Sequence, residues 1–175
     1  MKKFLTLLFV MMLIMTTFTA CGSGNEGGAA GGSVEGTPAE IIDKIYEQHP
    51  VADLPLGTIE IDLADPDAVK MFTGLDSAEG LKDIAVYEPM MGSIAFSLVL
   101  VRVDDAANAK DIAQKMSDNI DTRKWICVEA DDKLVAGYSD VVMLIMVGSD
   151  SGLTAQSYVD TFEEVAGGEV DFTIQ

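Results

Sequence analysis

The sequence predicts one α+β domain, a largely antiparallel sheet with helices packed on it. The chain has 175 residues, which leaves room for a single domain of ordinary size. From Ala85 onward the residue patterns run strand, strand, helix, two or three strands, helix, an order typical of α+β domains. Two of these strands, centred on 98–101 and 141–147, are apolar on both sides, as expected where both faces of a strand are covered.

The first twenty residues have the layout of a secretory signal peptide. Two lysines at 2–3 form a short basic region, and 4–18 is an uncharged, mostly apolar run. Small residues stand directly before Cys21, as at a lipoprotein cleavage site, although Phe18 takes a place where Leu, Val or Ile is preferred. We therefore expect cleavage between Ala20 and Cys21, and lipid attachment to Cys21.

The lipid is expected to hold the mature protein on the outer face of the cytoplasmic membrane. A diacylglycerol on Cys21 supplies two acyl chains, and stable anchoring takes two such signals. An uncleaved membrane helix and plain secretion are the alternatives, but 4–18 is shorter than the roughly twenty apolar residues that span a bilayer. Residues 22–36 are Gly-rich and poor in apolar residues, so 21–36 is expected to be a flexible tether and 37–175 the domain.

The first half of the domain is predicted to hold two helices and three strands. The sequence Thr-Pro-Ala-Glu at 37–40 is a capping box with Pro at the first helical position, so a helix is expected over 38–48, before Pro50. Asp-Pro-Asp at 65–67 starts a shorter helix that ends before Gly74. Alternating or continuous apolar patterns predict strands over 58–63, 83–87 and 93–103.

The second half is predicted to alternate helix and strand. Asp104 or Asp105 is expected to cap a helix in which Ala, Ile and Met recur at helical spacing between 109 and 120. Strands are expected over 124–130, 134–138 and 141–147, a turn at 131–133, a helix over 151–166 and an edge strand over 170–174. The doubly apolar strands need cover on two faces. We expect the first two helices to cover the second face; the alternative is another subunit.

The charge of the chain is strongly negative. It holds 29 acidic and 11 basic residues, a formal net charge of -18, and most of this charge lies in the domain. Such a surface repels nucleic acid and anionic headgroups, so we expect no nucleic-acid partner. Acidic residues cluster at 62–67, 104–105 and 131–132 without the spacing of a calcium-binding loop. We interpret them as turns and helix caps; weak Ca²⁺ binding is the alternative.

Few residues are available for catalysis or for a metal site. His49 is the sole histidine, which excludes a site built on two His ligands. With Cys21 lipidated, Cys127 is unpaired, and in its apolar run it is expected to be a buried small hydrophobe rather than a reactive thiol. The serine motifs at 117–119 and 150–152 lie near helix ends and lack the partners of a catalytic serine. We therefore expect no catalytic residue, no cofactor and no metal site.

Short motifs follow one another in a recognisable order between 39 and 149. They are Phe-Thr-Gly-Leu at 72–75, Val-Tyr-Glu-Pro-Met at 86–90, an apolar strand ending in Val-Asp at 103–104, a helix, and Asp-Val-Val at 140–142. This order resembles a domain-of-unknown-function family of small lipoproteins from Gram-positive anaerobes. The resemblance implies lipid anchoring and no established activity, and no catalytic residue is carried over from it.

Together these observations predict a membrane-anchored extracytoplasmic lipoprotein that is a non-catalytic interaction module. Its partners would be the membrane, through the lipid on Cys21, and a protein or envelope component. The alternative is binding of a small ligand or a divalent cation. The sequence makes no prediction of the oligomeric state.

Overall fold

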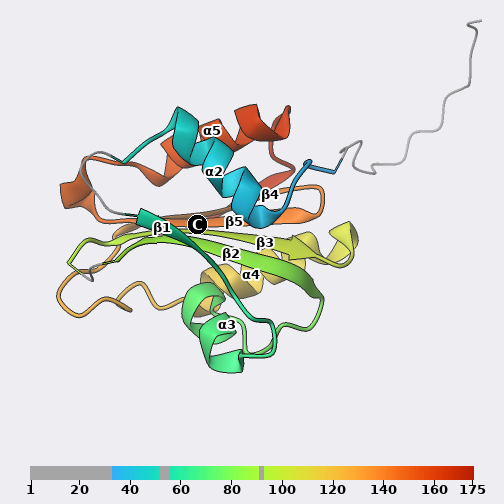
Figure 1. The fold of residues 1–175 in the computed structure, drawn as a ribbon, viewed down its shortest axis with the longest axis horizontal. Coiled ribbons are helices and arrows are strands. Elements are labelled where there is room, and N and C mark those ends of the chain that lie inside the picture. Colours follow the sequence, from blue (N-terminus) through green and yellow to red (C-terminus); the bar gives the residue numbers. More distant parts are fainter. Residues whose placement is uncertain (1–32, 52–55, 91–92) are drawn as a thin grey trace, which may run out of the picture.

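A six-stranded sheet with helices on both faces forms the described part of the chain (Figure 1). The computed structural model describes residues 33–51, 56–90 and 93–175. The predicted α+β fold class is confirmed. The elements are α2 (Pro38–Gln48), β1 (Leu56–Glu60), α3 (Pro66–Thr73), β2 (Leu81–Pro89), β3 (Phe96–Val103), α4 (Ala109–Asn119), β4 (Asp132–Tyr138), β5 (Val141–Val147), α5 (Ala155–Ala166) and β6 (Phe172–Ile174).

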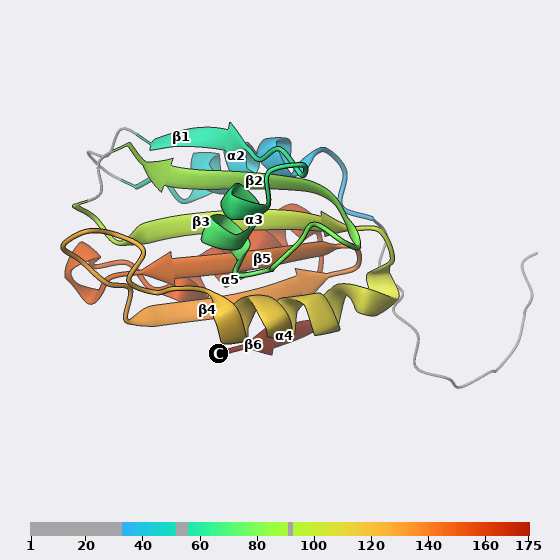
Figure 2. The same cartoon turned by 90° about the horizontal axis from the view of Figure 1, so that it is seen from below.

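The strand order in the sheet is β1-β2-β3-β5-β4-β6, and every neighbouring pair is antiparallel (Figure 2). The central pair is β3 with β5, in which Leu100 lies opposite Met143. All seven residues of β5 are buried, as its continuous apolar sequence predicts. At one edge β6 pairs with β4 alone, and the ring of Phe172 lies over Gly137 where a Cβ atom would otherwise be.

Each face of the sheet has its own pair of covering helices. On one face α2 and α5 enclose a core that includes Ile45 and Phe162 (Figure 1). On the other, α3 and α4 enclose a core that includes Val69 and Met116. Both faces are therefore covered within one chain. The expectation that the first two helices share a face is wrong.

The topology explains why the helices divide in this way. The segment with α4 joins β3 to β4, and that with α5 joins β5 to β6; each joins parallel strands two positions apart. Both connections move in the same direction along the sheet, but β3 and β5 run in opposite directions. Crossover connections between parallel strands are almost always right-handed, so α4 and α5 must lie on opposite faces of the sheet.

The helix ends follow the predicted capping chemistry. Thr37 and Glu40 form the expected capping box, with the Glu40 N–H donating to Thr37 Oγ1 at 3.2 Å and the Thr37 N–H donating to Glu40 Oε2 at 2.8 Å. Asp65 caps α3 by accepting two backbone N–H groups. Gly74 ends α3 in the left-handed conformation, with φ at 77°.

The segment 124–130, expected to be a strand, is a loop between α4 and β4. A further strand has no place beside β5, because β3 and β4 already occupy both of its edges. The strand β4 begins at Asp132, within the predicted turn, and includes the expected segment 134–138. The last helix begins at Ala155 rather than Ser151, because Ser149–Ser151 is a separate 3₁₀ turn.

Candidate functional site

The residues expected to carry the lipid lie outside the described residues. Cys21 and the cleavage position after Ala20 both precede Ser33, where the described residues begin, so their roles stay predictions. Within the ranges that the structure describes, no helix is both long enough and apolar enough to cross a membrane.

Residues 33–36, which the sequence analysis assigns to the tether, pack against the domain; we call them the strap. The guanidinium of Arg102, near the end of β3, donates to the hydroxyl of Ser33 at 3.2 Å. It also donates to the backbone carbonyls of Val34 at 2.9 Å and Gly36 at 2.7 Å. The folded part of the chain therefore includes four residues before Thr37, because one side chain satisfies three of their polar groups.

Arg102 is held in turn by Asp140, in the turn between β4 and β5. Their ion pair has an Nη1–Oδ2 distance of 2.6 Å, and the two side chains are only 14% and 19% exposed. Val34 is 6% exposed and joins the core beneath α2. The strap is thus fixed at the end of the sheet where β3 finishes and β5 begins.

A pocket of about 530 Å³ lies at the opposite end of the sheet, where β3 begins and β5 finishes; we call it the end pocket. Its walls are 93–95 before β3, 127–131 before β4, and 148–153 after β5, with Val51 completing the lining. The N–H of Gly148 donates to the carbonyl of Ala95 at 2.8 Å, which ties two of these segments together. Since β3 has eight residues, the strap and the end pocket are separated by roughly 25 Å.

Three exposed carboxylates surround the end pocket, from Glu129, Asp131 and Asp150. Hydrogen bonds from the Ser149 hydroxyl and backbone N–H hold the pKa of Asp131 below its ordinary value. Glu129 forms an ion pair with Arg123. Neither Asp131 nor Asp150 has an ion-pair partner in the described part of the chain, and no Lys or Arg lines the pocket. The rim is therefore predominantly anionic.

Cys127 is exposed and lines the end pocket, so the prediction that it is buried is wrong. The adjacent Ile126 is 94% exposed. The apolar pattern predicted burial of Cys127 wrongly because the segment 124–130 is a loop rather than a strand. Its buried anchor is Lys124, with Trp125 half-buried beside it.

Lys124 fastens this loop to the sheet with a buried charge. Its side chain is 5% exposed and its ammonium contacts the carboxylate of Glu88, at the end of β2. The ammonium also donates to Ser97 Oγ at 3.1 Å, and the rings of Phe72 and Trp125 lie 5.0 and 5.4 Å from it. Burial lowers the pKa of Lys124, and the negative charge of Glu88 opposes that shift.

The pairing of Ser97 with Lys124 does not make a nucleophilic site. Ser97 is fully buried in β3, and no substrate could reach its hydroxyl. Its partner Lys124 is buried as well and is held by the carboxylate of Glu88. The arrangement serves to position the loop that forms one wall of the end pocket.

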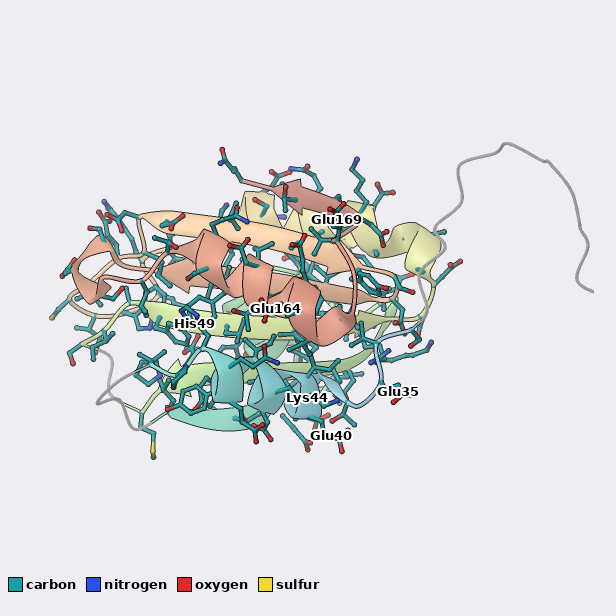
Figure 3. All side chains as sticks on the ribbon, turned by 90° about the horizontal axis from the view of Figure 1, so that it is seen from above. Glu35, Glu40, Lys44, His49, Glu164 and Glu169 are labelled. Carbon is teal, nitrogen blue, oxygen red and sulfur yellow. The ribbon has the colours of Figure 1, made fainter. Side chains whose placement is uncertain are left out.

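His49 lies at the end of α2, far from Glu35 in the strap (Figure 3). Its Nε2 atom is 3.4 Å from Ser157 Oγ, but that hydroxyl donates to the backbone carbonyl of Thr154 at 2.7 Å. The imidazole packs edge-on against Tyr158, with 4.5 Å between ring centroids. This geometry is that of a packed histidine at a helix end.

The two serine motifs have structural partners. Ser117 donates to the carbonyl of Gln175 at 3.0 Å. Ser151 donates to the carbonyl of Gly148 at 2.6 Å and accepts from the N–H of Leu153 at 3.2 Å. Both hydroxyls therefore stabilise chain ends and turns.

The acidic clusters contain helix caps and turns, as predicted. Asp65 caps α3, Asp105 accepts from a backbone N–H in the 3₁₀ turn before α4, and Asp132 accepts from the N–H of Ala155 at 2.7 Å. Among residues 33–51, 56–90 and 93–175, no group of three His, Cys, Asp or Glu side chains is placed to hold a metal ion.

Sequence reasoning missed both Arg102 and Lys124 because their partners are distant in the chain. Arg102 contacts the strap across more than sixty residues, and Lys124 bonds to Ser97 across 27. A signal was present in each case. Arg102 interrupts the otherwise apolar end of β3, and Lys124 precedes an apolar run. A charged residue that is buried at such a position needs a partner.

Comparison of the chain with protein-family models, curated proteins and solved structures finds no match. The resemblance to the lipoprotein family described above stays a hypothesis.

Proposed function

We propose that this protein is a lipid-anchored, extracytoplasmic, non-catalytic interaction module that presents its end pocket away from the membrane. The observation that carries the proposal is the position of the strap. Arg102 fixes the entry of the chain at one end of the sheet, and the end pocket lies at the other. An anchor on Cys21 would reach the domain only at the strap end.

Chain length and charge support this orientation. Twelve residue steps from Cys21 to Ser33 can span at most roughly 40 Å. That reach lets the domain stand clear of the headgroups. The net charge of -18 then disfavours contact of the domain with an anionic membrane surface.

The chemistry of the described residues supports a binding role rather than a catalytic one. Ser97, which accepts a hydrogen bond from Lys124, is buried, and the sole histidine faces a serine whose hydroxyl is engaged elsewhere. The second candidate function is binding of a small ligand in the end pocket. The volume of this pocket supports it, because about 530 Å³ lies in the range of small-molecule sites.

Anchoring is tested with Cys21→Ser in a bacterial host that processes lipoproteins. We expect the wild-type protein in the membrane fraction, carrying a diacylglycerol on its N-terminal residue by mass spectrometry. The variant should lose the lipid. An unmodified wild-type N-terminus, or a lipid that persists in Cys21→Ser, would contradict anchoring at this residue.

Orientation is tested with a fluorophore on Cys127, using the mature protein in phosphatidylcholine vesicles that contain headgroup spin-labelled lipid. The matched position is Lys44→Cys in a Cys127→Ser background, because Lys44 lies beside the strap and donates to the Glu35 carbonyl (Figure 3). We expect weaker quenching at Cys127 than at position 44. Stronger quenching at Cys127 would overturn the orientation. Arg102→Gln should reduce the difference between the positions, because it frees the strap.

A further inference from the structure

The end pocket has an apolar wall that the described residues leave partly exposed. Ile94 and Leu153 extend the core beneath α2 and α5, and Val128 extends the core beneath α3 and α4. All three side chains are half-buried. The pocket therefore lies where both cores reach the end of the sheet, and it offers apolar surface to a second molecule.

A pocket of similar volume, about 540 Å³, lies beside α4 but differs in chemistry. Its apolar residues, Leu75 and Ile112, are each only 7% exposed, and Lys115 lines it together with carboxylates. It presents little apolar surface and a mixed charge. Of these two pockets, the end pocket combines a partly exposed apolar wall with a lining that contains no Lys or Arg.

Exposed apolar side chains extend this surface beyond the pocket itself. Ile126 is 94% exposed and Met90 is 82% exposed. Both lie at the same end of the molecule, because the contact between Lys124 and Glu88 holds the loop of Ile126 beside the end of β2, which Met90 follows. A contact area that continues outside a pocket suits a polypeptide better than a small molecule.

We propose that the end pocket docks a basic polypeptide segment of a partner protein, with one large apolar side chain in the pocket and Lys or Arg side chains at its rim. The charge is complementary: Asp131 and Asp150 line the pocket without an ion-pair partner in the described part of the chain, and the whole chain carries -18. The carboxylates alone would not define a site; the partly exposed apolar wall beside them does. This inference rests on the proposed function, in which this end is the one presented to partners.

The test is a random hexapeptide display library screened against the mature lipoprotein held on phosphatidylcholine vesicles. We expect enriched peptides with at least two Lys or Arg and one large apolar residue. Alkylation of Cys127 with a bulky maleimide should abolish their binding, because this thiol lines the pocket. A Cys127→Ser protein treated with the same reagent should bind normally.

Charge is tested with a matched pair of double variants. Asp131→Asn/Asp150→Asn should weaken binding of the enriched peptides about tenfold at low salt and flatten its salt dependence. Glu164→Gln/Glu169→Gln removes the same charge near the C-terminal end of α5 and should have little effect, because the pocket lies before the start of that helix (Figure 3). An equal loss in both variants would overturn the rim's role.

The remaining outcomes separate this inference from the proposed function. Enrichment of neutral or acidic peptides that alkylation of Cys127 displaces would keep the binding end and overturn the basic partner. If alkylation of Cys127 leaves the binding of the enriched peptides unchanged, or if no peptide is enriched, the end pocket is not a docking site. This conclusion holds whatever the orientation measurement shows. Displacement of the basic peptides by spermidine at comparable concentration would overturn a polypeptide partner in favour of a small amine.

Discussion

At the scale of single residues, Tyr158 has its polar group buried in the core. It is 1% exposed, and its hydroxyl has no hydrogen-bond partner within the described residues. The rings of His49 and Phe96 pack edge-on against it, at centroid distances of 4.5 and 5.4 Å. Burial raises the pKa of Tyr158 above its ordinary value of 10.0, and the negative charge of Tyr46, once ionised, adds to the shift.

Tyr158→Phe is therefore expected to raise the free energy of unfolding by about 1 kcal/mol, because it removes a buried hydroxyl without a partner. The sign of the pH dependence follows from the raised pKa. Above pH 10.0 the Tyr158 hydroxyl loses its proton in the unfolded chain but keeps it in the folded one, so the free energy of unfolding falls with rising pH. The variant should lose less stability in that range. Urea denaturation below and above this pH, with Tyr138→Phe as control, measures both effects; an unchanged alkaline loss in Tyr158→Phe would contradict the assignment.

At the scale of elements, the loop before β4 depends on one buried ion pair. Lys124→Met should cost about 3–5 kcal/mol, because it leaves the Glu88 carboxylate buried without its partner. The double variant Lys124→Met/Glu88→Leu should recover most of this loss, since both charges are then absent. Arg123→Met is the control: its pair with Glu129 is exposed, and its loss should cost less than about 1 kcal/mol. A double-mutant cycle in denaturant measures the coupling, and additive costs would argue against the buried pair.

The junction of α3 with α4 depends on a close backbone approach at Gly74. A Cβ atom there would lie 2.6 Å from the backbone N of Ile120, and φ is 77°. Gly152 has a similar φ of 71° but nothing within 4 Å of such an atom. Gly152→Ala should cost about 1 kcal/mol, the penalty of the left-handed conformation. Gly74→Ala should cost clearly more, measured by thermal unfolding; equal costs would mean that the helices separate without penalty.

At the scale of the whole molecule, two cores share one sheet. The core beneath α2 includes Ile45 and the core beneath α4 includes Met116, and both side chains are fully buried. Ile45→Ala and Met116→Ala should each cost about 2–5 kcal/mol. Because β3 and β5 contribute side chains to both cores, each variant should shift a single cooperative unfolding transition. Separate transitions in scanning calorimetry would show that the layers unfold independently.

The sequence predicted most of the fold, because its elements are marked by local chemistry. The capping box at Thr37, the Asp65 cap and the buried strands depend on neighbouring residues alone, and each is confirmed. The loop at 124–130 was misassigned because apolar composition does not show whether the sheet has a free edge. The division of the helices depends on strand order, which the sequence left open.

The candidate site was largely out of reach of the sequence. The end pocket combines segments that are separated by up to about a hundred residues, and none of them carries a recognisable motif. Cys127 was singled out, but for burial rather than exposure. The strap could not be foreseen from composition, because its order depends on the distant Arg102 and on burial of the single apolar residue Val34.

The short strand β6 has a consequence for how copies of this chain meet one another. It supplies the hydrogen-bond partners of one edge of β4, and Phe172 shields the bare backbone at Gly137. Without Phe172–Ile174, the apolar centre of β4, Leu134–Ala136, would have an open edge that could pair with the same edge of another molecule. Three residues thus protect this edge of β4 from pairing with another copy of the chain.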